Sequence, residues 1–177
     1  MFIDFLIEIF KENSEKKSIV WNGQAYSYSM LLEQINEFGN IIEQSGIIPG
    51  TVVAVKGDFS PKSIALLLSL IESRCIILPL AITQEKLNKK LLQLAQVECT
   101  FNIDENETVN TKKYSNRSSN DYYEIIRKRG HPGIVMFTSG TSGEPKGAVH
   151  DFFYLLEKFK QRRTALNTLN FMLFDHW

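Results

Sequence analysis

Ten consecutive residues combine the side chains that hold phosphate groups in proteins: Thr138-Ser139-Gly140-Thr141-Ser142-Gly143-Glu144-Pro145-Lys146-Gly147. The segment contains four hydroxyl side chains, three glycines and one lysine. Glycine lets the backbone approach a ligand closely and leaves N–H groups free to converge on an anion. Hydroxyls donate hydrogen bonds with little bulk, and lysine supplies a mobile positive charge. These residue types predict a loop that binds a polyphosphate.

Two better-known phosphate loops do not fit this segment. A Walker A loop requires G-x-x-x-x-G-K-S/T, and counting from Gly140 places Pro145 where the second glycine belongs. The dinucleotide pattern G-x-G-x-x-G fails because Gly140 and Gly143 are three residues apart with no glycine between them. A surface turn rich in serine and glycine is the alternative interpretation.

The segment resembles the signature loop of the adenylate-forming superfamily, which includes acyl-CoA synthetases, luciferases and the adenylation domains of peptide synthetases. In that family a hydroxyl residue is followed by Ser/Thr/Gly, Gly, Ser/Thr, Ser/Thr/Glu, Gly, any residue, Pro, Lys and Gly, and residues 138–147 satisfy every position. Earlier segments are also similar to family motifs, in the family's order: Tyr26-Ser27-Tyr28, Gly46-Ile47-Ile48-Pro49-Gly50 and Leu78-Pro79-Leu80. The resemblance therefore extends over essentially the whole chain.

The resemblance implies ATP-dependent activation of a carboxylic acid, in which an acyl-adenylate forms and the acyl group then passes to a thiol. It implies ATP and Mg²⁺ as cofactors, with the metal ligands mostly outside this chain, and coenzyme A or a phosphopantetheine thiol as the acceptor. The residues expected to bind the ATP phosphates are Thr138, Ser139, Gly140, Thr141, Ser142, Gly143, Lys146 and Gly147. No catalytic residue is assigned within the chain. No metal site is expected, because the histidines lack metal-ligand spacing with cysteines or carboxylates.

The last residues resemble the family's next motif, where acyl-CoA synthetases have a histidine beside the acyl pocket. Peptide-synthetase adenylation domains instead have a Phe-Asp pair, whose aspartate holds the substrate amino group, and a serine two residues later. Trp177 stands in place of that serine, so His176 is the favoured acyl-pocket candidate and Asp175 the alternative. Of the other histidines, His131 is interpreted as a loop residue, and His150 as either a substrate contact or a helix-entry residue.

The leading interpretation is therefore an acid–thiol ligase of the acyl-CoA synthetase type, active in fatty acid metabolism. A fragment of a peptide-synthetase adenylation domain is one alternative, and a non-catalytic split subunit or remnant is another. Residues 1–177 are expected to form a partial N-terminal AMP-binding domain that lacks the C-terminal domain and is inactive alone. Such a piece should leave an unpaired sheet edge. The expected partners are a carboxylic acid substrate and a complementary C-terminal chain or a carrier protein.

Composition narrows the class of protein further. The 177 residues carry 20 basic and 20 acidic side chains, a balance that gives no indication of a nucleic-acid-binding face. No apolar run approaches the roughly 18 residues of a membrane span, and the first ten residues lack the basic region and cleavage site of a signal peptide. Cys75 and Cys99 are interpreted as reduced thiols in a core. Together these features predict a cytoplasmic protein.

Strand-like and helix-like segments alternate along the chain. Expected helices cover residues 2–10, 29–44, 60–71, 83–96, 122–129 and 152–159, and expected strands cover 19–21, 25–28, 51–55, 75–80, 98–103, 134–137 and 168–174. Asn22-Gly23 predicts a hairpin turn, and the polar residues 104–121 predict a surface loop. This order predicts an α/β fold with a largely parallel, doubly wound sheet flanked by helices. By resemblance it corresponds to the first part of an acyl-CoA synthetase N-terminal domain.

Overall fold

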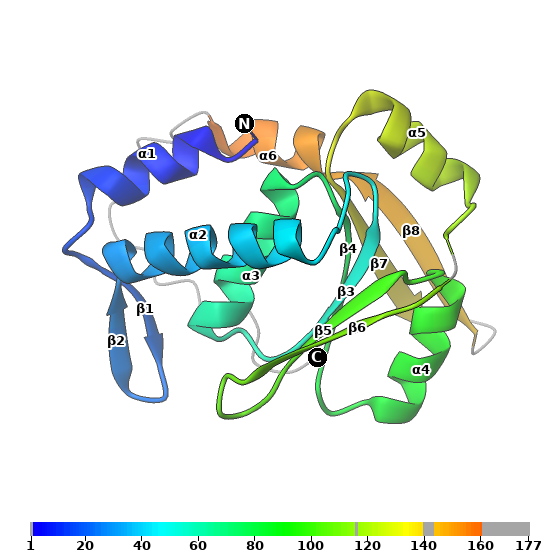
Figure 1. The fold of residues 1–177 in the computed structure, drawn as a ribbon, viewed down its shortest axis with the longest axis horizontal. Coiled ribbons are helices and arrows are strands. Elements are labelled where there is room, and N and C mark those ends of the chain that lie inside the picture. Colours follow the sequence, from blue (N-terminus) through cyan, green and yellow to red (C-terminus); the bar gives the residue numbers. More distant parts are fainter. Residues whose placement is uncertain (1, 116, 140–143, 161–177) are drawn as a thin grey trace.

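A computed structural model describes residues 2–115, 117–139 and 144–160. The described chain forms a six-stranded sheet with helices against it, and a separate two-stranded hairpin stands away from this sheet (Figure 1). The helices are α1 (Asp4–Glu12), α2 (Tyr28–Gln44), α3 (Pro61–Glu72), α4 (Glu85–Leu94), α5 (Asp121–Arg129) and α6 (Phe152–Lys160). The strands are β1 (Lys17–Trp21), β2 (Gln24–Ser27), β3 (Val52–Lys56), β4 (Ile76–Leu80), β5 (Cys99–Ile103), β6 (Val109–Lys113), β7 (Gly133–Ser139) and β8 (Pro145–Asp151).

The six-stranded sheet has the order β6-β5-β3-β4-β7-β8. Its three inner pairings, β5 with β3, β3 with β4 and β4 with β7, are parallel. The outer strands β6 and β8 pair antiparallel to their neighbours. Because β3 leads to β4 on one side and β4 returns to β5 on the other, the chain winds in both directions, as a doubly wound sheet requires. The predicted fold class is confirmed.

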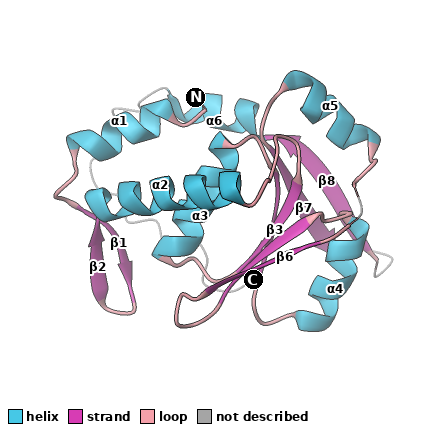
Figure 2. Ribbon diagram, in the orientation of Figure 1, coloured by secondary structure: helices cyan, strands magenta, loops and turns pink. Residues whose placement is uncertain are grey.

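Helices cover both faces of the sheet, and the alternation of side chains along β3 separates the two cores (Figure 2). Val53 and Val55 point into a core shared with α2, α3 and α6. Val52 and Ala54 point into a second core shared with α4 and α5. All four residues are buried, which explains why β3 reads as a continuous apolar run rather than an alternating one.

Local signals set most of the element boundaries. Asn22 and Gly23 have φ angles of 49° and 76°, as the turn of the β1–β2 hairpin requires. Ser60 caps α3 and Pro61 occupies its first turn, as expected. The second helix begins slightly earlier than predicted, because the Ser27 hydroxyl, not that of Ser29, accepts the Met30 N–H. None of the six described helices combines the length and apolarity that a membrane span needs.

Two strands depart from the sequence-based expectations. Residues 104–121 were expected to be a polar loop, but β6 lies within this segment and pairs with β5 from Val109 to Lys113. An edge strand contacts only one neighbour and stays largely exposed, so its side chains are polar and carry no apolar signal. The second is β8, which begins inside the predicted phosphate loop, at Pro145, and extends to the predicted helix. The strand expected at residues 168–174 lies outside the described residues.

Candidate phosphate-binding site

The predicted phosphate loop is the tip of the hairpin formed by β7 and β8. The two strands pair without a register shift from Gly133↔Asp151 to Ser139↔Pro145. Thr138 and Ser139 therefore lie at the end of β7, and Lys146 and Gly147 lie at the start of β8. Four of the predicted phosphate-binding residues, at positions 140–143, lie outside the described residues, as do the acyl-pocket candidates Asp175 and His176.

Lys146 is directly opposite Thr138 in the hairpin, so their side chains share one face of the ribbon. Both residues are exposed. Among the described residues Lys146 forms no ion pair, which leaves its ammonium group available to an anion. His150, exposed four residues along β8, lies on the same face. The hairpin thus presents a cation and a hydroxyl side by side at the carboxyl end of the sheet.

Gly147 has a packing role in this hairpin. It pairs with Phe137 across the strands, and a Cβ atom at position 147 would lie 3.0 Å from the Phe137 Cε1 atom. Real Cβ atoms are rarely that close to a ring carbon, so the aromatic ring would have to move. The last glycine of the signature segment therefore accommodates the ring of Phe137.

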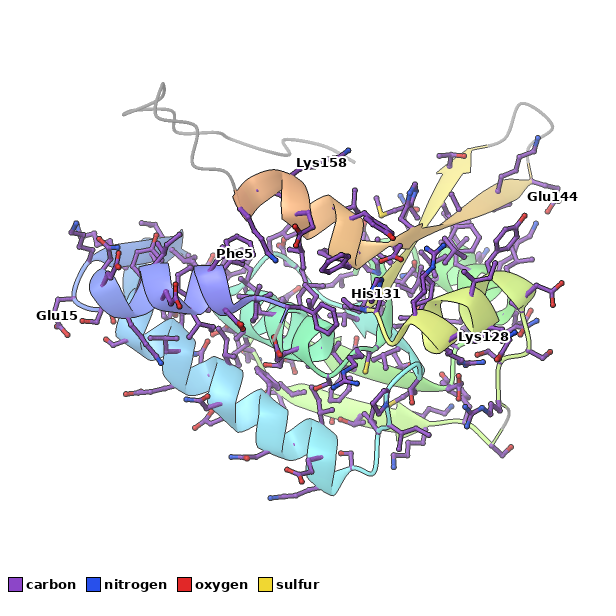
Figure 3. The ribbon with its side chains drawn as sticks, turned by 90° about the horizontal axis from the view of Figure 1, so that it is seen from above. Phe5, Glu15, Lys128, His131, Glu144 and Lys158 are labelled. Carbon is purple, nitrogen blue, oxygen red and sulfur yellow. The ribbon has the colours of Figure 1, made fainter. Side chains whose placement is uncertain are left out.

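Glu144 connects the tip of the hairpin to α4. Its carboxylate forms an ion pair with the Lys90 ammonium group, with side-chain exposures of 70% for Glu144 and 44% for Lys90. Figure 3 shows Glu144 at the far end of the hairpin, away from His131 at its base. Because exposed pairs contribute little free energy, this contact orients the hairpin only loosely.

The base of the hairpin is held more firmly, around the carboxylate of Asp151. His131 Nδ1 lies 3.0 Å from Asp151 Oδ2, and Arg129 Nη1 donates to the same oxygen at 3.0 Å. The Phe153 N–H donates to Asp151 Oδ1, and the His131 ring stacks against the Phe153 ring with centroids 4.6 Å apart. His131 lies in a loop, as predicted, but it is also an anchor. No sequence signal links it to a partner twenty residues away.

Over the described residues no three His, Cys, Asp or Glu side chains gather as metal ligands. Both cysteines are free and buried, in agreement with their interpretation as core thiols. Burial, together with the nearby Cys99 and Glu98, raises the pKa of the Cys75 thiol to about 12. The described part of the chain therefore offers an exposed cation and an exposed hydroxyl at the hairpin, but neither a cluster of metal ligands nor an activated thiol.

A family model described as AMP-binding enzyme matches residues 57–173. The chain belongs to this family. The matched range includes all ten residues of the signature segment, among them Thr138 and Lys146.

The proteins that the chain resembles in sequence include synthetases many times its length. The chain is 24% identical over 163 residues to the hybrid PKS-NRPS synthetase xenE of Xenoacremonium sinensis, covering 83% of this chain and 4% of that synthetase. It is 24% identical over 168 residues to bacitracin synthase 3 of Bacillus licheniformis, covering 81% of this chain and 2% of that synthase. The chain thus spans a small fraction of the length of these relatives.

Solved structures share the fold. The N-terminal subdomain of NpsA from Klebsiella oxytoca superposes with a TM-score of 0.63 at 19% identity, covering 82% of this chain and 40% of that one. VinN superposes with a TM-score of 0.65 at 14% identity, covering 88% of this chain and 46% of that one. At these identities the likeness concerns the fold alone.

Proposed function

We propose that the chain serves ATP-dependent activation of a carboxylic acid, and that the β7–β8 hairpin binds the pyrophosphate portion of ATP. The observation that carries this proposal is the position of Lys146 in a member of the AMP-binding family. Lys146 is exposed, has no ion-pair partner among the described residues, and lies opposite Thr138 near the end of β7. In open α/β sheets, ligands bind outside the carboxyl ends of the strands. The hairpin tip lies at that end.

Acid activation needs positioning and charge neutralisation more than acid–base chemistry. A carboxylate oxygen attacks the α-phosphorus, a P–O bond forms, and the bond to the leaving pyrophosphate breaks. Negative charge accumulates on the pyrophosphate oxygens, where the Lys146 ammonium group stabilises it and the Thr138 hydroxyl donates a hydrogen bond. Mg²⁺, which family membership implies, neutralises further phosphate charge when bound.

The peptide-synthetase alternative is better supported than the acyl-CoA synthetase interpretation. The relatives named above are synthetases of the PKS-NRPS and bacitracin type, and one structural neighbour is an artificial fusion of the NpsA adenylation domain with a PCP domain. We therefore propose an amino or related acid as substrate and the phosphopantetheine thiol of a carrier protein as acceptor. Under this proposal Asp175, rather than His176, is the candidate for holding a substrate amino group.

Calorimetric titration of the chain with Mg²⁺·pyrophosphate and Mg²⁺·ATP tests the phosphate assignment. Lys146→Ala should weaken binding about 10- to 100-fold, because a charge-assisted hydrogen bond is worth about 1.5–3 kcal/mol. Lys158→Ala removes another exposed lysine, from α6, and should leave binding unchanged. Equal affinities for wild type and Lys146→Ala, with both folded by circular dichroism, would refute the assignment.

The acid class has its own test. In a protein that contains this chain with the later family motifs, ATP–pyrophosphate exchange should be stimulated by amino acids and not by fatty acids. Stimulation by fatty acids alone would restore the acyl-CoA synthetase interpretation.

A further inference from the structure

The central sheet opens between β4 and β7 towards the phosphate hairpin. β3 pairs with β4 through all five residues from Val52↔Ile76 to Lys56↔Leu80. β4 pairs with β7 only at Ile76↔Gly133 and Ile77↔Ile134. β7 continues to Ser139, paired on its other side with β8 throughout. The hairpin therefore leaves the sheet just after Ile134.

Pro79 explains where the pairing stops. The Ile76 N–H donates to Thr51 and the Leu80 carbonyl accepts from Gly57, so the even residues of β4 bond towards β3. The Cys75 carbonyl accepts from Gly133, so the odd residues bond towards β7. In this register the next bond would run from the N–H of residue 79 to the Val135 carbonyl, and proline has no N–H to donate.

A cavity and two exposed side chains lie beyond this point. A cavity of about 150 Å³ lies where the strands diverge, lined by Pro79, Val135, Met136 and Phe137 together with Asn88 of α4. Pro79 is exposed although it lies on an inner strand, and Met136 is 45% exposed. β8 is the last strand of the described sheet. The distal hairpin is tied to the rest of the fold through the exposed Lys90–Glu144 pair and through the apolar contacts of Val135, Phe137 and Val149.

We propose that Pro79 is a positioning residue that uncouples the distal half of the β7–β8 hairpin from the sheet, so that Thr138 and Lys146 can adjust to a bound polyphosphate. The adjustment to polyphosphate rests on the proposed function, whereas the uncoupling of the distal hairpin from the sheet rests on the strand pairing alone. The base of the hairpin stays fixed through Gly133 and the contacts of Asp151, and the bend is placed just after Ile134.

Hydrogen exchange on the whole chain tests the uncoupling without any ligand. In the wild type, the amide of Phe137, which faces β4 beyond the last bond, should exchange faster than the amides of Gly133 and Val135, which face the same side of β7. Pro79→Ala restores the N–H at residue 79, lets the pairing extend and should slow exchange at Phe137 about fivefold, the factor for one net hydrogen bond of about 1 kcal/mol. Pro49→Ala, in an exposed turn, is the matched control and should leave these amides unchanged.

Exchange at Phe137 as slow as at Gly133 and Val135 in the wild type would overturn the proposal, even if Pro79→Ala did not fold. Unchanged exchange at Phe137 in a folded Pro79→Ala would also overturn it. The adjustment is tested separately by titration with Mg²⁺·pyrophosphate, which Pro79→Ala should bind about fivefold more weakly than wild type if one stabilising bond must break. Equal binding by the two would limit Pro79 to a structural role. Absence of binding by the wild type itself would refute the proposed function and leave the exchange result standing.

Discussion

The two ends of the parallel sheet are built in opposite ways. At the amino end, Arg127 of α5 is 9% exposed and donates to Glu98, Ser118, Glu124 and the Gly50 carbonyl. At the carboxyl end, Lys146 is exposed and has no ion-pair partner among the described residues. Since a buried charge is costly unless paired, the first arrangement serves the fold. An exposed free cation adds little to stability and remains available to a ligand.

Contacts at the amino end also give a structural reason for the last glycine of Gly46-Ile47-Ile48-Pro49-Gly50, a segment similar to a family motif. Gly50 has a φ angle of 80°, and a Cβ atom there would lie 2.6 Å from the Arg127 Cγ atom. Glycine is needed both for the left-handed backbone and for the stem of the arginine. The Gly50 position is therefore structural, in contrast to Lys146.

Removing the arginine should have the largest effect on stability. Arg127→Ala leaves Glu98, whose side chain is only 14% exposed, without its cation, and we expect the free energy of unfolding to fall by about 3 kcal/mol. Urea denaturation measures this loss. Arg117→Ala, an exposed arginine of the same region, should change the value by less than about 0.5 kcal/mol. A similar small effect for Arg127→Ala would remove the distinction between the two ends.

A substitution within the β7–β8 hairpin should cause a smaller loss of stability. Gly147→Ala should destabilise the fold by about 1 kcal/mol, because the new methyl group displaces the Phe137 ring. Gly39→Ala, where a Cβ atom meets nothing within 4 Å in α2, should instead stabilise by about 1 kcal/mol. Adding Phe137→Leu to Gly147→Ala should recover part of the loss in urea denaturation. No recovery would show that the cost has another origin.

The smallest expected effect on stability comes from Tyr123 and depends on alkaline pH. The Tyr123 hydroxyl donates to the Ala95 carbonyl at 2.9 Å, and burial raises the pKa of this tyrosine from 10.0 to about 12. Since the folded state favours the neutral phenol, stability is retained below pH 10 and falls as the pH rises towards 12. Tyr123→Phe should lose about 1 kcal/mol at pH 8 and show a weaker decline above pH 10. Cys75 contributes in the same direction, so wild type and variant are compared at each pH. Parallel declines would contradict the assignment.

The sequence predicted what depends on local pattern. Apolar runs identified β3, β4, β5 and β7, helix periodicity identified the helices, and Asn22-Gly23 identified the hairpin turn. It did not predict β8, because Pro145 and Gly147 interrupt any alternation and the strand is defined by its pairing with β7. Arg127 and Glu98 are 29 residues apart, and no spacing rule links them. The signature segment was found because its chemistry is contiguous, whereas the anchors His131 and Asp151 meet only through the hairpin.

We propose that the carboxyl end of the sheet binds ATP while the amino end holds the fold. Hydrogen exchange measured with and without Mg²⁺·ATP compares the two ends in one experiment. We predict slower exchange with nucleotide in residues 133–139 and 145–151 and no change in residues 98–101 and 121–129. Protection confined to the amino end, or none in the hairpin at a nucleotide concentration that saturates binding, would contradict the account.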